Sequence, residues 1–135
     1  MKRLLVVISL VLICSNSAAS DDFSARESRA QKLERSPAGL KYLMGFMQHV
    51  DAETTKIMGV CFNSGKVGTT DTFKIVADIQ ADGSITDVAV RPATDQTKCY
   101  AEKFGRVKAP LLPSHFQSAG FPIIIHASQT YKGAP

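Results

Sequence analysis

The stretch that decides the fold is residues 73–92, FKIVADIQADGSITDVAVRP, in which apolar and polar residues alternate on both sides of Asp82-Gly83. Such alternation is typical of a half-buried strand, and Asp-Gly favours a tight turn between antiparallel strands. In the return strand the alternation slips by one residue between Ile85 and Val88, so both side chains reach one face only through a bulge near Thr86-Asp87. The sequence therefore predicts a bulged β-hairpin with one buried face.

A helical pattern precedes the hairpin. Ser36-Pro37 is a typical helix start, because Ser caps the first free amides and Pro at the first position loses no hydrogen bond. The apolar residues that follow recur at spacings of three and four, which predicts a buried stripe, and Asp51 can cap a further turn or two over residues 51–60. The stripe consists of Leu40, Leu43, Met44, Met47 and Val50. We expect Leu40, Leu43 and Met47 to cover the hairpin face made by Phe73, Ile75 and Ile79.

The rest of the chain completes an α+β pattern. Thr94 and Asp95 open a second helix that runs to about Gly105, and the unbroken apolar run in residues 121–127 predicts a strand covered on both faces. Residues 21–35 are polar and charge-rich, which fits either a weak helix or a frayed arm. The predicted fold is one domain over residues 36–135, with a helical segment followed by β-β-α-β and a small antiparallel three-strand sheet.

The beginning of the chain predicts export. Lys2 and Arg3 precede an apolar run over residues 4–14 and small residues at positions 17–19, an order typical of a secretory signal peptide, here residues 1–20. Ile13 before Cys14 disfavours a lipoprotein signal, which needs a small residue there. We therefore expect a periplasmic protein without a membrane span.

The net charge of the chain disfavours two classes of partner. The whole chain has 16 basic and 12 acidic residues; loss of residues 1–20 removes two basic ones, so 14 minus 12 leaves a net charge of +2. A charge this small and scattered does not favour binding to nucleic acid or to an anionic membrane surface.

Two cysteines remain after the leader, Cys61 and Cys99. In an oxidising compartment they predict one disulfide, which constrains the unfolded chain by about 4 kcal/mol in the chain-entropy treatment. The alternative, a redox or metal pair, is disfavoured because Cys-x-x-Cys spacing and further metal ligands are missing.

Residues 60–131 resemble the periplasmic C-terminal domain of TonB-type proteins. The matching features are a strand, then ADG, then SITDVAV with its Ile-x-x-Val-x-Val, a helix, a proline-containing loop, a glycine and a closing strand. The positions of Cys61 and Cys99 are similar to those of the two-cysteine variants of this domain. The chain lacks the long proline-rich spacer and the W-x-F-P segment, so the resemblance implies the fold and not energy transduction to outer-membrane receptors.

No pattern for catalysis, metal binding or a cofactor accompanies the three histidines, His49, His115 and His126. The methionine and aromatic residues of the first helix, Met44, Phe46, Met47 and Met58, are either core or a soft groove for a partner. The sequence thus favours a non-enzymatic protein-binding module without cofactors.

Binding is expected at a sheet edge or through the loops of residues 62–71 and 108–120. The candidate partner-binding residues are Lys74, Arg91, Lys108, His115 and Phe116. The partner would be another periplasmic or envelope protein, with the chain acting as an accessory subunit of an envelope or secretion assembly or as an immunity-type inhibitor; a homo-oligomer is also compatible. The rival hypotheses are a small hydrolase that uses His115 or His126, and a small-ligand-binding protein.

Overall fold

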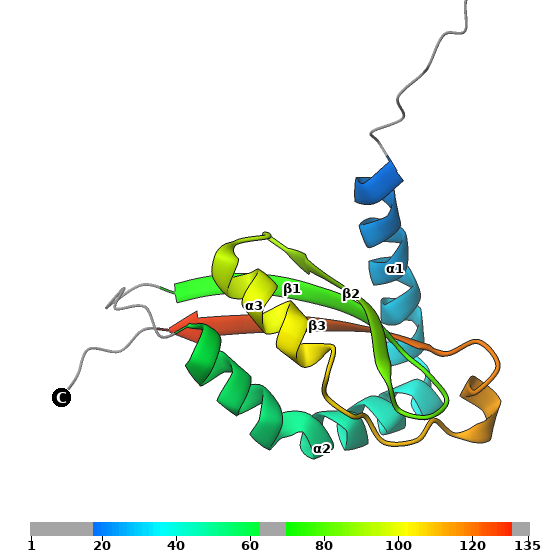
Figure 1. The fold of residues 1–135 in the computed structure, drawn as a ribbon. Coiled ribbons are helices and arrows are strands. Elements are labelled where there is room, and N and C mark those ends of the chain that lie inside the picture. Colours follow the sequence, from blue (N-terminus) through cyan, green and yellow to red (C-terminus); the bar gives the residue numbers. More distant parts are fainter. Residues whose placement is uncertain (1–17, 63–69, 131–135) are drawn as a thin grey trace, which may run out of the picture.

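The computed structural model describes residues 18–62 and 70–130 (Figure 1). In chain order the elements are helix α1 (Ala18–Glu34), helix α2 (Pro37–Cys61), strand β1 (Thr70–Ile79), strand β2 (Ile85–Arg91), helix α3 (Asp95–Phe104), the 3₁₀ turn η1 (Ser114–Phe116) and strand β3 (Phe121–Thr130). Residues 1–17 of the predicted leader (residues 1–20) and residues 63–69 of the predicted loop lie outside the described residues, and α1 begins within the predicted leader at Ala18. No helix in the described ranges combines the length and apolarity needed to cross a membrane.

The three strands form one antiparallel sheet in the order β2-β1-β3, which confirms the predicted α+β class. Residues of α2 and α3 pack on one face of the sheet, and residues of α1 pack on the other (Figure 1). The central strand β1 therefore contributes to two cores: Phe73, Ile75 and Ile79 point to α2 and α3, while Val76 points to α1.

The hairpin turn forms where the Asp-Gly pair predicts it. The Gln80 and Gly83 amides donate to the carbonyls of Ser84 and Gln80 respectively, each at 2.9 Å. Gly83 has φ +82°, a conformation that glycine adopts without steric cost. Asp82 Oδ1 accepts hydrogen bonds from the Ser84 hydroxyl at 2.6 Å and the Ser84 amide at 2.9 Å. These bonds to the ionised form lower the pKa of Asp82.

The predicted bulge is confirmed. Val76 pairs with Ala89 and Asp78 pairs with Thr86, so Ala77 alone lies opposite two residues of β2, Asp87 and Val88. Asp87 takes up the extra residue with a φ of +51°. As a result Ile85, Val88 and Val90 all face the α2 and α3 side of the sheet.

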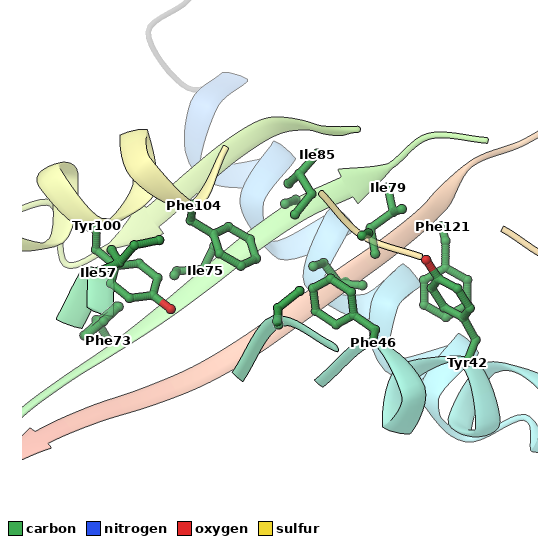
Figure 2. Close-up of a cluster of buried hydrophobic side chains, with 14 of the residues drawn as sticks. Tyr42, Phe46, Ile57, Phe73, Ile75, Ile79, Ile85, Tyr100, Phe104 and Phe121 are labelled. Atoms are coloured by element: carbon green, nitrogen blue, oxygen red, sulfur yellow. The ribbon is translucent and has the colours of Figure 1, made fainter. Parts of the chain in front are cut away.

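Helix α2 is one continuous helix, and its predicted inward face is only partly right: Val50 is buried and Leu43 packs against the core, as predicted, but the other three stripe residues are exposed. Ser36 caps it by accepting from the Gly39 amide at 3.1 Å, as predicted. The large buried side chains of α2 are those of Tyr42, Phe46, Val50 and Ile57; Figure 2 labels Tyr42, Phe46 and Ile57. Leu40, Met44 and Met47, which the pattern assigned to the core, are 48%, 59% and 44% exposed.

Aromatic contacts explain this orientation of α2. The Phe46 ring lies edge-on to Phe104 of α3 with ring centroids 6.5 Å apart, and the Tyr42 ring contacts Phe121 of β3 at 4.9 Å. Figure 2 shows these rings pointing between the helices and the sheet. Aromatic side chains bury more apolar area than leucine or methionine. When two stripes of a helix have the same spacing, the stripe with the aromatic residues therefore packs against the core.

The closing strand is covered on both faces, as its apolar run predicts. Ile123 is 1% exposed on the α2 side and Ile124 is 4% exposed on the α1 side. Burial of consecutive residues on a period-two strand requires layers above and below it.

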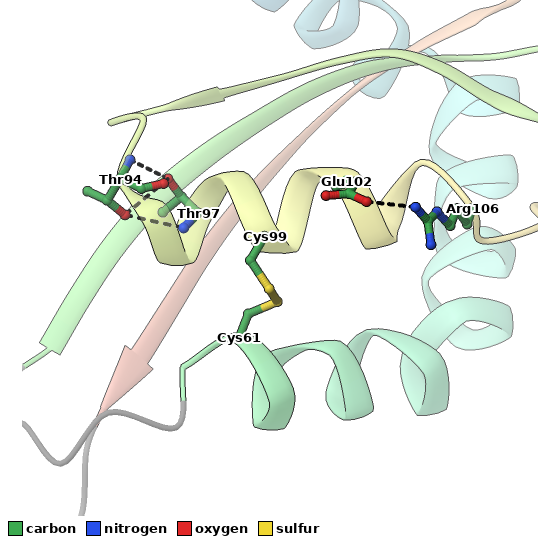
Figure 3. Close-up of a disulfide and its surroundings, with 6 residues drawn as sticks. All are labelled: Cys61, Thr94, Thr97, Cys99, Glu102 and Arg106. Carbon is green, nitrogen blue, oxygen red and sulfur yellow. Dashed lines mark hydrogen bonds and ion pairs between the residues drawn. A yellow bond between two sulfur atoms is a disulfide. The ribbon is translucent and has the colours of Figure 1, made fainter.

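The disulfide is confirmed between Cys61 and Cys99. It joins the last residue of α2 to the middle of α3, with the Cα atoms 5.7 Å apart (Figure 3). Thr94 caps α3 by accepting from the Thr97 amide at 3.2 Å, and the Thr97 hydroxyl accepts from the Thr94 amide at 2.8 Å. The Cys61–Cys99 disulfide fits an oxidising compartment outside the cytosol.

Of the two alternatives for the N-terminal segment, the structure has a helix, α1. Phe23 and Ala30 are buried against Val76 and Ile124 of the sheet. Between them Arg26 is only 7% exposed, and its guanidinium donates to the Asp78 carboxylate at 3.1 Å and to the backbone carbonyl of the bulge residue Asp87. This mostly polar helix therefore docks through two buried apolar residues and one buried cation. The cation, Arg26, binds the carbonyl of Asp87, the bulge residue with positive φ.

Candidate partner-binding surface

The outer edge of β3 is the regular open edge of the sheet. All ten residues of β3 pair with β1 in an unbroken register, and among the described strands β3 has no partner on its other side. The opposite edge strand, β2, has seven residues and is interrupted by the bulge. Short, bulged edges resist strand addition, whereas long regular ones invite it.

An exposed apolar stripe runs along α2. Leu40, Met44 and Met47 are spaced by four and three, so they share one face of the helix; we call them the α2 stripe. The flank of α2 that faces α3 carries His49 and Glu53, which border the same hollow as Lys103 and Val107 at the end of α3. Gly45 comes five positions after Leu40, which places it roughly 140° around the helix from Leu40 at about 100° per residue, away from the stripe.

The α2 stripe lies on the β3 side of the helical layer. Tyr42 contacts Phe121 at the start of β3, and Phe62, which follows α2, stacks on Phe73, the β1 residue that pairs with Ala127 of β3. Helix α2 therefore runs along β3, as Figure 1 shows, while α3 packs next to β2. The flank of α2 that faces away from α3 is consequently on the β3 side of the helical layer.

Three basic residues form a row across the other face of the sheet. Lys74 of β1 pairs with Arg91 of β2 on one side and with His126 of β3 on the other. Lys74 Nζ donates to Glu27 of α1 at 2.8 Å, and the Arg91 guanidinium lies 4.4 Å from the ring centroid of Phe23. Lys74 and Arg91, predicted as partner-binding residues, thus come together and contact α1.

The other predicted residues lie elsewhere. Lys108 Nζ is 3.7 Å from the Asp82 carboxylate at the hairpin turn. His115 and Phe116 share η1 with ring centroids 4.1 Å apart, and the Phe116 ring packs edge-on against Phe121. The five predicted residues therefore occupy three separate places. Glu27 and Phe23 of α1 contact Lys74 and Arg91 of the basic row. No pattern in the sequence relates these two α1 residues to the hairpin.

A groove of about 600 Å³ separates α2 from the loop that precedes η1. We call it the α2-loop groove and define it by six of its lining residues: Lys41, Tyr42, Gly45, His49, Leu111 and His115. The Tyr42 hydroxyl donates to the Pro110 carbonyl at 2.7 Å, and burial raises the pKa of Tyr42 to about 12. The groove lies on the flank of α2 that does not carry the α2 stripe.

The histidines do not form a hydrolytic arrangement with their neighbours. His115 contacts Phe116, and His126 lies opposite Lys74 in the sheet. Near His126, burial raises the pKa of the Glu34 carboxyl, an effect that the imidazole partly offsets. In residues 18–62 and 70–130 no hydroxyl or carboxylate hydrogen-bonds to either imidazole, and no three His, Cys, Asp or Glu side chains gather as metal ligands.

The surface is thus a regular strand edge on the same side of the molecule as exposed leucine and methionine side chains, with separate basic and apolar hollows.

No protein-family model, no curated protein and no solved structure matches this chain.

Proposed function

We propose that this chain is a non-enzymatic, exported module that binds another envelope protein by strand addition to β3. The observation that carries the proposal is the regular open edge of β3 beside the α2 stripe. Backbone donors and acceptors along the edge supply hydrogen bonds to an added strand, and exposed side chains beside it supply specificity. The predicted leader and the Cys61–Cys99 disulfide support a periplasmic location.

The α2 stripe contributes the apolar part of this surface. Methionine is flexible and polarisable, so it adapts to the shape of a partner side chain. Full burial of an exposed methionine is worth about 1.5–3 kcal/mol, and Met44 and Met47 are 59% and 44% exposed, so burying what remains of both together is worth about this much, roughly tenfold or more in affinity. Two physiological versions fit: an accessory subunit of an envelope or secretion assembly, and an immunity-type inhibitor.

The test combines affinity capture with hydrogen exchange. The protein captures its partner from envelope extract, the partner is identified and purified, and amide exchange is compared between free and bound protein. We expect slower exchange along β3 in the complex. Glutamate at Met44 and Met47 should weaken binding by about tenfold or more. Val60→Glu is the matched control, because Val60 is an apolar α2 residue that is 64% exposed and lies outside the stripe.

Two results would contradict the proposal. One is a complex in which β3 amides exchange as fast as in the free protein. The other is a complex that tolerates Met44→Glu and Met47→Glu as well as it tolerates Val60→Glu.

A further inference from the structure

The α2-loop groove has the chemistry of a ligand site, and it is separate from the β3 edge. Its walls are mostly apolar or aromatic, and among the described lining residues Lys41 is the one lysine, with no arginine or acidic residue. Three other hollows on the described chain each include a carboxylate: Glu27 in one, Asp87 and Glu102 in the second, and Glu53 in the third. The α2-loop groove therefore combines apolar walls with a positive rim that no carboxylate among its lining residues neutralises.

The interior of the groove offers no unsatisfied polar group to a ligand. The hydroxyl of Tyr42 is already bonded to the Pro110 carbonyl, and Phe46, Leu111 and Pro113 are apolar. A ligand body that enters the groove gains by removing apolar surface from water and has no buried donor to satisfy. His49 and His115 also line the groove, and His49 lies eight residues after Lys41 on α2, about 12 Å along the helix axis.

Gly45 lines the groove without a side chain. A Cβ atom added at Gly45 would have nothing within 4 Å, so no close neighbour requires glycine there. Glycine inside a helix costs about 1 kcal/mol relative to alanine. The α2-loop groove has a volume of about 600 Å³, within the roughly 300–1,000 Å³ that is usual for small-molecule sites.

We propose that the α2-loop groove binds a single-chain amphiphile with a carboxylate headgroup, the chemical class of a fatty acid. The hydrocarbon chain lies against Tyr42, Phe46 and Leu111, and the carboxylate lies at Lys41. One fixed positive charge matches a singly charged headgroup, which favours a carboxylate over a phosphate monoester.

Dodecanoate is the probe, added below the concentration at which it forms micelles and followed by amide chemical shifts. We expect saturable shifts confined to groove residues. Gly45→Phe fills the groove and should weaken binding by about tenfold or more, equivalent to about 1.4 kcal/mol. Gly59→Phe is the matched control, because its Cβ also meets nothing within 4 Å and it lies in α2 outside the groove. Lys41→Gln should weaken binding about two- to fivefold, as loss of an exposed charge pair does.

Other probes separate the alternatives. Dodecyltrimethylammonium has the same chain with the opposite charge and should bind more weakly than dodecanoate; equal binding would overturn the assignment of Lys41. Tighter binding of a lysophosphatidate with the same chain would overturn the carboxylate. Leu111→Asp, at a side chain 72% exposed, is a second blocking variant in case Gly45→Phe fails to fold.

Three further outcomes would refute the site itself. These are the absence of saturable dodecanoate binding, binding that Gly45→Phe and Leu111→Asp leave unchanged, and self-association of the protein that Gly45→Phe abolishes while dodecanoate does not bind. None of them bears on strand addition at β3, because neither blocking variant touches the α2 stripe.

Discussion

Replacement of Arg26 tests whether one buried cation holds α1 on the sheet. The guanidinium donates to Asp78 and to the Asp87 carbonyl, and the side chains of Arg26 and Asp78 are 8% and 25% exposed. Arg26→Met keeps most of the side-chain length but leaves both acceptors without this donor. Because the two acceptors belong to the bulge region of the sheet, the variant should weaken the docking of the whole helix.

The expected cost follows from the burial of the pair. Breaking a fully buried ion pair by removing one partner costs about 3–5 kcal/mol, since the remaining charge is left uncompensated. Asp78 is one quarter exposed, so water can solvate part of its carboxylate once the guanidinium is gone. We therefore expect a loss of about 2–3 kcal/mol.

Urea-induced unfolding measures the global part of this loss, and amide exchange in α1 measures local undocking. Arg106→Met is the matched control, because Arg106 pairs with Glu102 at 2.6 Å while their side chains are 73% and 69% exposed. That variant should change stability by at most about 0.5 kcal/mol. If Arg26→Met matched Arg106→Met in both urea midpoint and α1 exchange, the buried pair would not hold the helix.

Two further predictions concern stability. Replacing Cys61 and Cys99 by serine should lower the free energy of unfolding by about 4 kcal/mol, because the bond spans 38 residues; an unchanged urea midpoint would contradict this. Burial raises the pKa of Tyr42 and Tyr100 from 10.0 to about 12. Because the unfolded chain then loses these protons at a lower pH than the folded chain, the stability that the two neutral phenols contribute is complete below about pH 10 and is lost as the pH rises towards 12. Urea titrations from pH 8 to pH 11 should show this decline, and Tyr100→Phe should reduce it; a flat profile would show that the phenols are accessible.

The hairpin could be predicted because its determinants are local. The Asp82-Gly83 turn follows from backbone preference, and the bulge follows from the phase slip between Ile85 and Val88. The apolar run of β3 likewise reveals its two covered faces. These features need no knowledge of which distant residues meet.

The orientation of α2 could not be predicted from spacing alone, because two stripes of the helix have the same period. The inward one is selected by Phe104 and Phe121, which receive the rings of Phe46 and Tyr42. The exposed methionines that this leaves beside β3 were consequently assigned to the core.

The docking of α1 was hidden for a different reason. Its main polar anchor, Arg26, binds a backbone carbonyl that becomes available only at the bulge of a strand 61 residues later. No pattern within residues 21–35 encodes that acceptor. The same applies to Lys74 and Arg91, whose residue types suggested a partner surface and whose neighbours Glu27 and Phe23 come from α1.

The position of the disulfide in the chain divides the domain into a closed and an open part. The covalent ring from Cys61 to Cys99 encloses β1 and β2, whereas β3 begins 22 residues after the ring ends. Thermal opening can therefore detach β3 while the hairpin, α2 and α3 remain linked. Reduction of the disulfide should accordingly speed the exchange of hairpin amides more than that of β3 amides. The strand that we assign to partner recognition is the one that no cross-link restrains.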